Sequence, residues 1–466
     1  MVDLLLKNGW IVTPLDTYAA DIAINEGIIA AIRKPGSEVQ AKREIDLSGK
    51  YVLPGVIEPH MHVEAPFMGC LGQLDFYTAS KVAAFGGVTF FMDFTNTGVG
   101  DSVLERVASR REEMAKSAID YGIHAKFVEA SPRVIAEIKD IVAYGCPSFK
   151  MFMTYKKEGV MIDDEGMIKV LKAAQRHGAL PGVHAESNAI AELNVERMSR
   201  AGELSWANFP RSKPNLCEKE AVDRAINLAR YTGSSLYFFH LSTREGLASV
   251  TEARKSGLPV IAETCPHYLV LDQSRYEGDD GYLAIMSPPL RSPADSEALW
   301  QGLAEGGLSL IGSDNCTYSI EEKQRFLERD SSGGLIPDFT KVVNGVSGLE
   351  ERLPLLLEYG VHQQRLSLNQ VCAITSYNPS KIFGLYPRKG TIQVGSDADL
   401  AVIDLEKTAV VDERALHYEN SYTLYTGRTI HGWPVMTIAG GRVLVENGVF
   451  YGEPGSGRFI PRKIAG

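Results

Sequence analysis

Four histidines and an aspartate stand at or just after the ends of short apolar segments, where they could bind metal ions. His60 and His62 are two residues apart, and residues two apart on a strand point the same way, so both imidazoles can reach one ion. His184, His240 and Asp314 each end a further apolar segment. Neutral imidazoles with a carboxylate suit Zn²⁺ or a similar transition metal rather than Ca²⁺ or Mg²⁺. Taken alone, the His60 and His62 pair is equally consistent with two ordinary histidines.

A lysine lies inside another apolar segment, where an ammonium group is unfavourable. Lys150 is flanked by Phe149, Met151 and Phe152, and burial beside cationic metal ions opposes its charged form. Its free amine can react with CO₂ to give a carbamate, whose two oxygens could bridge two ions. Two ions ~3.5–4 Å apart would share a water and acidify it toward hydroxide. The alternative is that Lys150 extends to an exposed edge and keeps its charge in water.

The elements that must position these residues alternate between strands and helices. Helical periodicity separates most of the apolar segments, as in Asp163–His177, Glu218–Tyr231 and Ala294–Ala304. The candidate strands are Val52–Pro59, Val88–Phe94, Ile123–Glu129, Pro147–Met153, Leu180–Glu186, Ser235–Ser242, Pro259–Cys265 and Leu308–Asp314. This alternation predicts an α/β protein with a parallel sheet, and eight units fit a (β/α)₈ TIM-like barrel. The candidate ligands then lie at the carboxyl ends of the strands, where barrel active sites form.

An open doubly wound sheet is the alternative architecture. Such a sheet would be expected to carry a glycine-rich phosphate turn after its first strand. Here that position holds Glu58-Pro59-His60-Met61-His62. The sequence therefore favours the barrel.

Both ends of the chain are rich in short strands and turns. Residues 1–53 and 387–450 are predicted to pair into one small β-sandwich domain, because isolated hairpins are only marginally stable in water. The first strand is expected to run into a turn at Asn8-Gly9. Residues 54–386 would form the barrel. Residues 451–466 would form a tail that contacts a neighbouring subunit.

Composition narrows the class of protein. The chain has 466 residues, a formal charge of −10 and six cysteines without CxxC spacing. Scattered cysteines indicate reduced thiols in a cytoplasmic protein rather than a disulfide framework. The absence of a basic stripe argues against a nucleic-acid partner, and no apolar run is long enough to span a membrane. A small-molecule substrate is the remaining expectation.

Several motifs along nearly the whole chain resemble the cyclic amidohydrolases, most closely the dihydropyrimidinase/hydantoinase (D-hydantoinase) branch. The motifs are Glu58-Pro59-His60-Met61-His62, Ser148-Phe149-Lys150-Met151-Phe152-Met153, Glu263-Thr264-Cys265-Pro266, Met286-Ser287-Pro288-Pro289-Leu290-Arg291 and Asn378–Tyr386. The resemblance implies a barrel with a β-sandwich built from both chain ends. It also implies two zinc ions per subunit, with N6-carboxylated Lys150 bridging them. One zinc would be bound by His60, His62 and Asp314, and the other by His184 and His240.

The same resemblance implies an activity. A binuclear zinc hydrolase would open the cyclic amide of a dihydropyrimidine or 5-substituted hydantoin to the N-carbamoyl amino acid. Asp314 would take a proton from the attacking water and pass it to the leaving nitrogen, and Tyr155 would stabilise the oxyanion. Backbone groups of Ser287 and Asn344 would hold the ring edge. Without the resemblance, Tyr155 would be interpreted as a surface-loop residue. Relatives suggest a homotetramer, although a homodimer is equally consistent with the residues.

Some positions depart from the family pattern and keep other functions open. Asn315 stands where a histidine is usual. Val343, before Asn344, and Ser347, before Gly348, stand where the family tends to carry prolines. These changes leave room for a related cyclic imide or lactam amidohydrolase, or an allantoinase-like enzyme. Glu64 would repel the carboxylate of dihydroorotate. A non-catalytic scaffold of the collapsin response mediator type is a hypothesis from another class, and a measurement of bound metal would distinguish it.

The loops expected to shape a substrate pocket are 64–72, 94–100 and 153–161. Aromatic residues on or beside these loops are pocket candidates, although aromatics there are equally consistent with packing beneath the loops. They are Phe67, Phe94, Phe152 and Tyr155.

Overall fold

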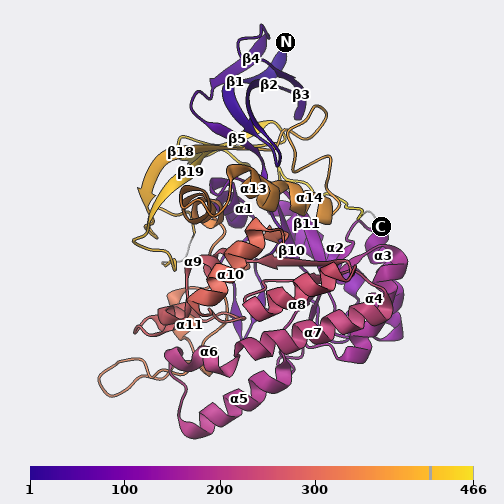
Figure 1. The fold of residues 1–466 in the computed structure, drawn as a ribbon, viewed down its shortest axis with the longest axis vertical. Helices are drawn as coiled ribbons and strands as arrows, with labels where there is room; N and C mark the ends of the chain where they lie inside the picture. Colours follow the sequence, from indigo (N-terminus) through magenta and orange to yellow (C-terminus); the bar gives the residue numbers. More distant parts are fainter. Residues whose placement is uncertain (419–421, 465–466) are drawn as a thin grey trace.

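A computed structural model describes residues 1–418 and 422–464 of the chain. Two large sheets dominate it, and Figure 1 shows one of them above the helices of the other. Residues 419–421, within the predicted second sandwich segment, and residues 465–466 of the predicted tail lie outside the described residues.

The larger body is built on eight parallel strands that pair in sequence order. These strands are β6 (Val56–Glu58), β10 (Val88–Phe94), β11 (Asp120–Lys126), β12 (Ser148–Phe152), β13 (Leu180–His184), β14 (Leu236–Phe238), β15 (Val260–Thr264) and β16 (Leu310–Ile311). Beyond the first and eighth strands, β7 (Met61–His62) pairs in parallel with β17 (Asn315–Cys316), which joins the two ends of the sheet. The predicted TIM-like barrel is confirmed.

Helices connect the barrel strands and cover their outer faces (Figure 1). The main ones are α1 (Phe76–Phe85), α2 (Val103–Glu113), α3 (Pro132–Ala143), α4 (Asp164–His177), α5 (Asn188–Ala201), α7 (Asn215–Thr232), α8 (Arg244–Lys255) and α10 (Pro293–Ala304). Helix α4 shows why they begin and end where they do. The Asp163 side chain accepts a hydrogen bond from the Gly166 N–H, and Gly178 ends the helix in the left-handed region at φ 71°.

Both chain ends combine in a separate nine-stranded sheet, as predicted. Its strands are β1 (Val2–Val12), β2 (Thr17–Asn25), β3 (Ile28–Arg33), β4 (Ala41–Asp46), β5 (Tyr51–Pro54), β18 (Leu400–Val410), β19 (Thr429–Ala439), β20 (Arg442–Glu446) and β21 (Val449–Phe450). Strand β5 joins the two ends because it pairs with β1 on one side and β18 on the other. A buried apolar cluster of its own supports this sheet and includes Leu6, Ile24, Val52 and Leu400.

Two local predictions were wrong. The segment Val52–Pro59 is two strands, because the chain leaves the terminal sheet after β5 and enters the barrel at β6. Gly55 sits at this change, and a Cβ there would lie 2.0 Å from the Thr89 hydroxyl oxygen. Asn8-Gly9 is an irregularity within β1 rather than a turn, since the strand continues to Val12 with Asn8 at φ 62°.

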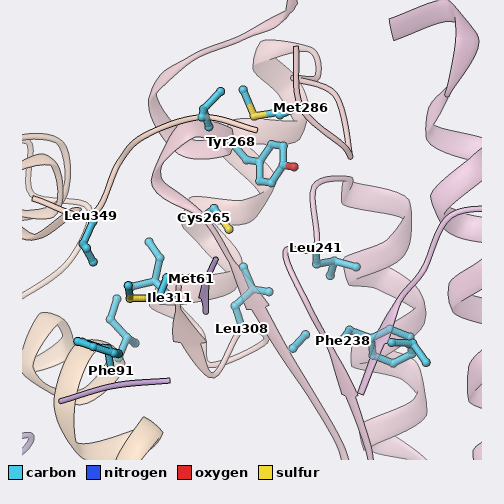
Figure 2. Packing of buried hydrophobic residues seen from close by; sticks show 14 of the residues in the cluster. Met61, Phe91, Phe238, Leu241, Cys265, Tyr268, Met286, Leu308, Ile311 and Leu349 are labelled. Carbon is cyan, nitrogen blue, oxygen red and sulfur yellow. The ribbon is translucent and has the colours of Figure 1, made fainter. Parts of the chain in front are cut away.

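Alternating side chains on the barrel strands separate an interior from an outer core. Phe90, Met92 and Phe94 belong to one cluster with Tyr237 and residues from other barrel strands, whereas the intervening Phe91 belongs to the main core with the helices. Figure 2 shows part of that main core. The apolar interior leaves the carboxyl ends of the strands as the place for polar chemistry.

The tail packs against the chain's own barrel. The Tyr121 N–H donates to the carbonyl of Arg458, and the Ile460 N–H donates to the carbonyl of Tyr121. The buried Arg462 guanidinium donates to the Ser148 hydroxyl at 2.9 Å. These contacts lie at the start of β11 and β12, and the predicted contact with a neighbouring subunit stays a prediction. Among the described residues, the helices are too short or too polar to cross a membrane.

Candidate active site

A pocket at the carboxyl ends of the barrel strands collects nearly all the predicted site residues. Its lining includes His62, Lys150, Tyr155, His184, His240, Ser287, Asp314 and Asn344. The four aromatic residues predicted to shape it, Phe67, Phe94, Phe152 and Tyr155, also line it. His60 lies directly below, fully buried.

His60, His62 and Asp314 form one compact group. Asp314 Oδ1 lies 3.0 Å from His60 Nε2 and 3.3 Å from His62 Nε2, and the candidate ligand atoms all lie within 4.8 Å of one another. Although burial opposes it, the neighbouring His60 holds the pKa of Asp314 well below its usual range. An ionised carboxylate facing two imidazole nitrogens is a donor set that fits a transition-metal ion.

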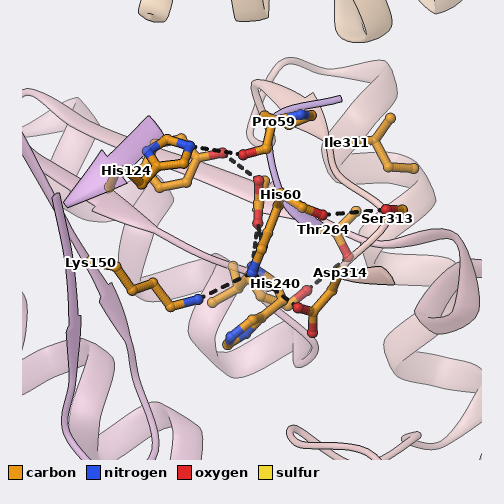
Figure 3. A network of polar contacts seen from close by, with 12 residues as sticks. Pro59, His60, His124, Lys150, His240, Thr264, Ile311, Ser313 and Asp314 are labelled. Atoms are coloured by element: carbon orange, nitrogen blue, oxygen red, sulfur yellow. Dashed lines mark hydrogen bonds and ion pairs between the residues drawn. The ribbon is translucent and has the colours of Figure 1, made fainter. Parts of the chain in front are cut away.

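Lys150 reaches from the middle of β12 into this group (Figure 3). Its Nζ lies 3.2 Å from His60 Nε2 and 3.9 Å from the centre of the Phe239 ring. Burial lowers the pKa of Lys150 to about 8, against the raising effect of Asp314 and Glu263. Gly182 on β13 leaves room for this arrangement, because a Cβ there would lie 2.4 Å from the Phe239 ring. The alternative of an exposed, solvated Lys150 is therefore wrong.

His184 and His240 form a second group beside Lys150. Their ring centres are 4.4 Å apart, and the His184 Nε2 lies 2.7 Å from the Glu186 carboxylate. Burial lowers the pKa of His184 to about 4 and that of His240 well below its usual range. Both rings are therefore neutral, which is the form that binds metal. His240 Nδ1 is buried without a hydrogen-bond partner in the described parts of the chain.

Glu263 orients His60 from below, a role that was not predicted from the sequence. Its carboxylate accepts hydrogen bonds from His60 Nδ1, from the His240 N–H at 3.1 Å and from the Tyr237 hydroxyl at 2.5 Å. A carboxylate on one ring nitrogen fixes the tautomer, so His60 presents Nε2 to Lys150 and Asp314. Glu263 is part of the motif Glu263-Thr264-Cys265-Pro266. Its position at the end of an apolar strand is the feature of the sequence that could have identified it as a site residue.

Tyr155, Ser287 and Asn344 meet on the other side of the pocket. The Asn344 amide lies 3.3 Å from the Ser287 hydroxyl and 3.5 Å from the Tyr155 hydroxyl. Burial raises the pKa of Tyr155, so its hydroxyl keeps its proton and can donate. Lys213, which no motif pointed to, donates to Ser287 Oγ at 2.8 Å and to Glu186 at 2.7 Å. Although burial opposes it, Glu186 raises the pKa of Lys213 to about 12, so it carries a charge beside the ring of Tyr155.

The backbone is strained at three of these positions. Tyr155, His240 and Asp314 have φ values of 65°, 39° and 49°. Residues other than glycine rarely adopt this conformation, and such strain gathers at functional sites. All three residues follow the end of a barrel strand, where the chain must turn its side chains into the mouth.

Asn315, which departs from the family pattern, and Lys323 hold loops in place. The Asn315 side chain accepts from the Gly348 N–H at 3.2 Å and donates to the Thr317 hydroxyl at 3.1 Å. Lys323 is fully buried and donates at 2.9 Å to the carbonyls of both Ile285 and Val343. It thereby ties together the two loops that carry Ser287 and Asn344.

Comparisons with known proteins agree with this geometry. Residues 51–444 match the model of the amidohydrolase family. A D-hydantoinase of Geobacillus stearothermophilus is 37% identical over 462 residues, covering 98% of this chain and 96% of the relative. A dihydropyrimidinase of Rattus norvegicus is 34% identical and covers 99% and 89%. The crystal structure of a dihydropyrimidinase from Brevibacillus agri superposes with a TM-score of 0.95 at 36% identity, covering 99% of both chains.

The fold and the site thus define a barrel hydrolase, and the chain belongs to the amidohydrolase family. Its relatives place it in the dihydropyrimidinase and hydantoinase branch of that family, so the predicted resemblance and the predicted enzyme class are confirmed.

Proposed function

We propose that this chain opens the ring of a dihydropyrimidine or a 5-substituted hydantoin by hydrolysing one cyclic amide bond, giving the N-carbamoyl amino acid. The observation that supports it most is the position of Lys150 between two groups of ligand side chains. Its Nζ lies 3.2 Å from His60 and within the same pocket as His184 and His240. A carboxylated lysine there would have one oxygen for an ion held by His60, His62 and Asp314, and one for an ion held by His184 and His240.

The donor chemistry of the chain fits two zinc ions. His60, His62 and Asp314 would hold one ion, His184 and His240 the other, and carboxylated Lys150 would bridge them. When bound, the two ions would supply an activated water at neutral pH and Lewis-acid stabilisation of charge on oxygen. Because burial lowers the pKa of Lys150 to about 8, a larger share of it is free amine at neutral pH than in an exposed lysine. The free amine is the form that reacts with CO₂.

The remaining steps are carried by side chains of this pocket. Asp314 is ionised and could take the proton of the attacking water and transfer it to the ring nitrogen that leaves. Tyr155 keeps its proton and could donate to the carbonyl oxygen as negative charge develops there. Ser287 and Asn344 would hold the ring edge, and Lys323 would keep their loops in register.

A ring-opening assay tests this function. Protein prepared with zinc and bicarbonate would be given dihydrouracil, dihydrothymine, hydantoins, allantoin, dihydroorotate and simple imides, and the products would be identified by mass spectrometry. We expect N-carbamoyl products from dihydropyrimidines or hydantoins. Turnover confined to allantoin or simple imides, or no bound metal and no turnover at all, would reject the proposal. The predicted homotetramer or homodimer and the cytoplasmic location can be checked on the same protein by sedimentation and by cell fractionation.

A further inference from the structure

One charged side chain of the pocket has no role in the chemistry above. Apart from the predicted metal ligands, Lys126 is the charged residue in the pocket lining of the described structure. It is the last residue of β11, and its backbone pairs with Lys150 on β12. Paired residues on neighbouring parallel strands point to the same face of the sheet, so the Lys126 side chain projects into the barrel mouth.

Burial lowers the pKa of Lys126 to about 8, so most of its side chain is an ammonium group at pH 7. This group has no ion-pair partner among the described residues. In the described parts of the chain, no ion pair or side-chain hydrogen bond involves its Nζ, and only its backbone N–H is engaged, with the Thr95 hydroxyl at 2.8 Å. The nearby acids are already occupied. Asp101 binds Arg106 through both oxygens at 2.9 and 3.0 Å, and Asp93 binds Arg110 at 2.8 Å.

The pocket that Lys126 lines has both polar and apolar walls. Thr95, whose hydroxyl accepts from the Lys126 N–H, lines it together with Asn96, and Phe67, Phe152 and Val160 add apolar surface. A partly buried, unpaired cation is unfavourable unless an anion arrives to pair with it. Among the described residues that line the pocket, Asp314 is the acid, and it faces His60 and His62.

The order of the barrel strands places Lys126 on the far side of the mouth from the ring-binding loops. Strand β11 is third and β15 is seventh in the order of eight strands, so they face each other across the barrel. Ser287 lies beyond β15, at the side where the ring edge would be held. A group attached to the opposite edge of the ring would then point toward β11.

We propose that Lys126 is the receptor for a carboxylate on the substrate's ring substituent, so that this enzyme prefers cyclic diamides with a short acidic side chain. This inference rests on the proposed function, because it assigns the substrate class of that reaction. It differs from dihydroorotate binding, in which the carboxylate is attached directly to the ring and Glu64 was expected to repel it. Glu64 is not among the described residues that line the pocket.

The test compares two substrates of nearly equal shape. The probes are 5-(2-carboxyethyl)hydantoin and its neutral amide, 5-(2-carbamoylethyl)hydantoin, and the readout is the ratio of their kcat/KM values on one preparation. We expect the acid to be preferred by about tenfold or more, as for hydrogen bonds to charged groups. Inactive protein in the preparation lowers both constants equally and leaves the ratio unaltered.

Three variants assign the preference to the ammonium group. Lys126→Met should reduce the ratio to about one or below, and Lys126→Arg should retain most of it. Lys139→Met removes an exposed positive charge from α3 outside the pocket and should leave the ratio as in the wild type. If Lys126→Met does not fold, Lys126→Gln takes its place.

The possible failures are distinguishable. A wild-type ratio near one, with the neutral amide hydrolysed well, overturns the role of Lys126 and leaves the proposed function standing. A loss of bound zinc and of both activities in equal measure in Lys126→Met would show that Lys126 serves the metal centre instead. Absence of hydrolysis for every cyclic amide would overturn both proposals.

Discussion

Replacing Glu263 by glutamine should weaken metal binding without disturbing the fold. Glu263 accepts hydrogen bonds from His60 Nδ1, the His240 N–H and the Tyr237 hydroxyl. Glutamine has the same shape. Its carbonyl oxygen can still accept from His60 and His240, and its NH₂ group can donate to the oxygen of Tyr237. What the variant removes is the negative charge that makes His60 a stronger ligand.

The expected size follows from that loss of charge. Partners of this kind typically change metal affinity by 10- to 100-fold, which corresponds to about 1.4 to 2.7 kcal/mol. The assay is titration of metal-free protein with zinc in competition with a chromophoric chelator at constant pH. Tyr237→Phe is the matched control, because it removes one donor to Glu263 and keeps the carboxylate charge, and it should change the affinity by less than about threefold.

Two results would refute this reasoning. A Glu263→Gln variant that binds zinc within twofold of the wild type would show that His60 is not a metal ligand or does not depend on its carboxylate partner. Equal losses in Glu263→Gln and Tyr237→Phe would assign the effect to hydrogen-bond geometry rather than to charge. Circular dichroism of the metal-free proteins would establish that all three share one fold.

Four further outcomes can be measured on the same protein. Lys150→Ala should lose hydrolysis and most of its bound metal, and retained turnover without added short carboxylic acids would contradict the bridging role. Asp314→Asn should keep the fold and lose hydrolysis, so near-normal turnover would reject the proton transfer. Tyr155→Phe should lower kcat by about 10²- to 10³-fold at unchanged zinc content, as for loss of an oxyanion donor, and a change below threefold would count against it. Burial raises the pKa of Glu351 to about 7, so the stability that its protonated form contributes is fully present below pH 4.5 and is lost as the pH rises through 7. Glu351→Gln should remove about 2.5 kcal/mol of this pH dependence in urea unfolding at pH 5 and 8, and an unaltered pH dependence would contradict it.

The site residues were largely predictable because barrel chemistry follows strand ends. His184, His240 and Asp314 each closed an apolar segment, and the structure brings all three to the pocket. The partners that orient them were not predicted. Glu186 lies only two residues from His184. Glu263 and Lys213 come from other segments than His60 and Ser287, and their contacts with these residues exist only once the barrel has closed.

Local sequence was least reliable where the chain passes between the two sheets. The segment Val52–Pro59 has the apolar character of one strand, yet Gly55 divides it because Thr89 occupies the space of a side chain. Asn8-Gly9 has the composition of a turn but lies within β1, where Asn8 adopts positive φ and its N–H donates to Asp21 at 2.8 Å. In both places a neighbour distant in sequence decides the local conformation.

By itself, the sequence determined the strand and helix alternation, the joining of both chain ends and the residue types at the strand ends, since periodicity and residue chemistry are local properties. Only the tertiary structure decided that Lys150 lies against His60, that Glu263 selects the ring nitrogen His60 presents, and that Lys126 faces the pocket with no ion-pair partner among the described residues. The physical reason is that burial and pairing of a charge depend on every element around it, and these elements meet only when the eight strands close.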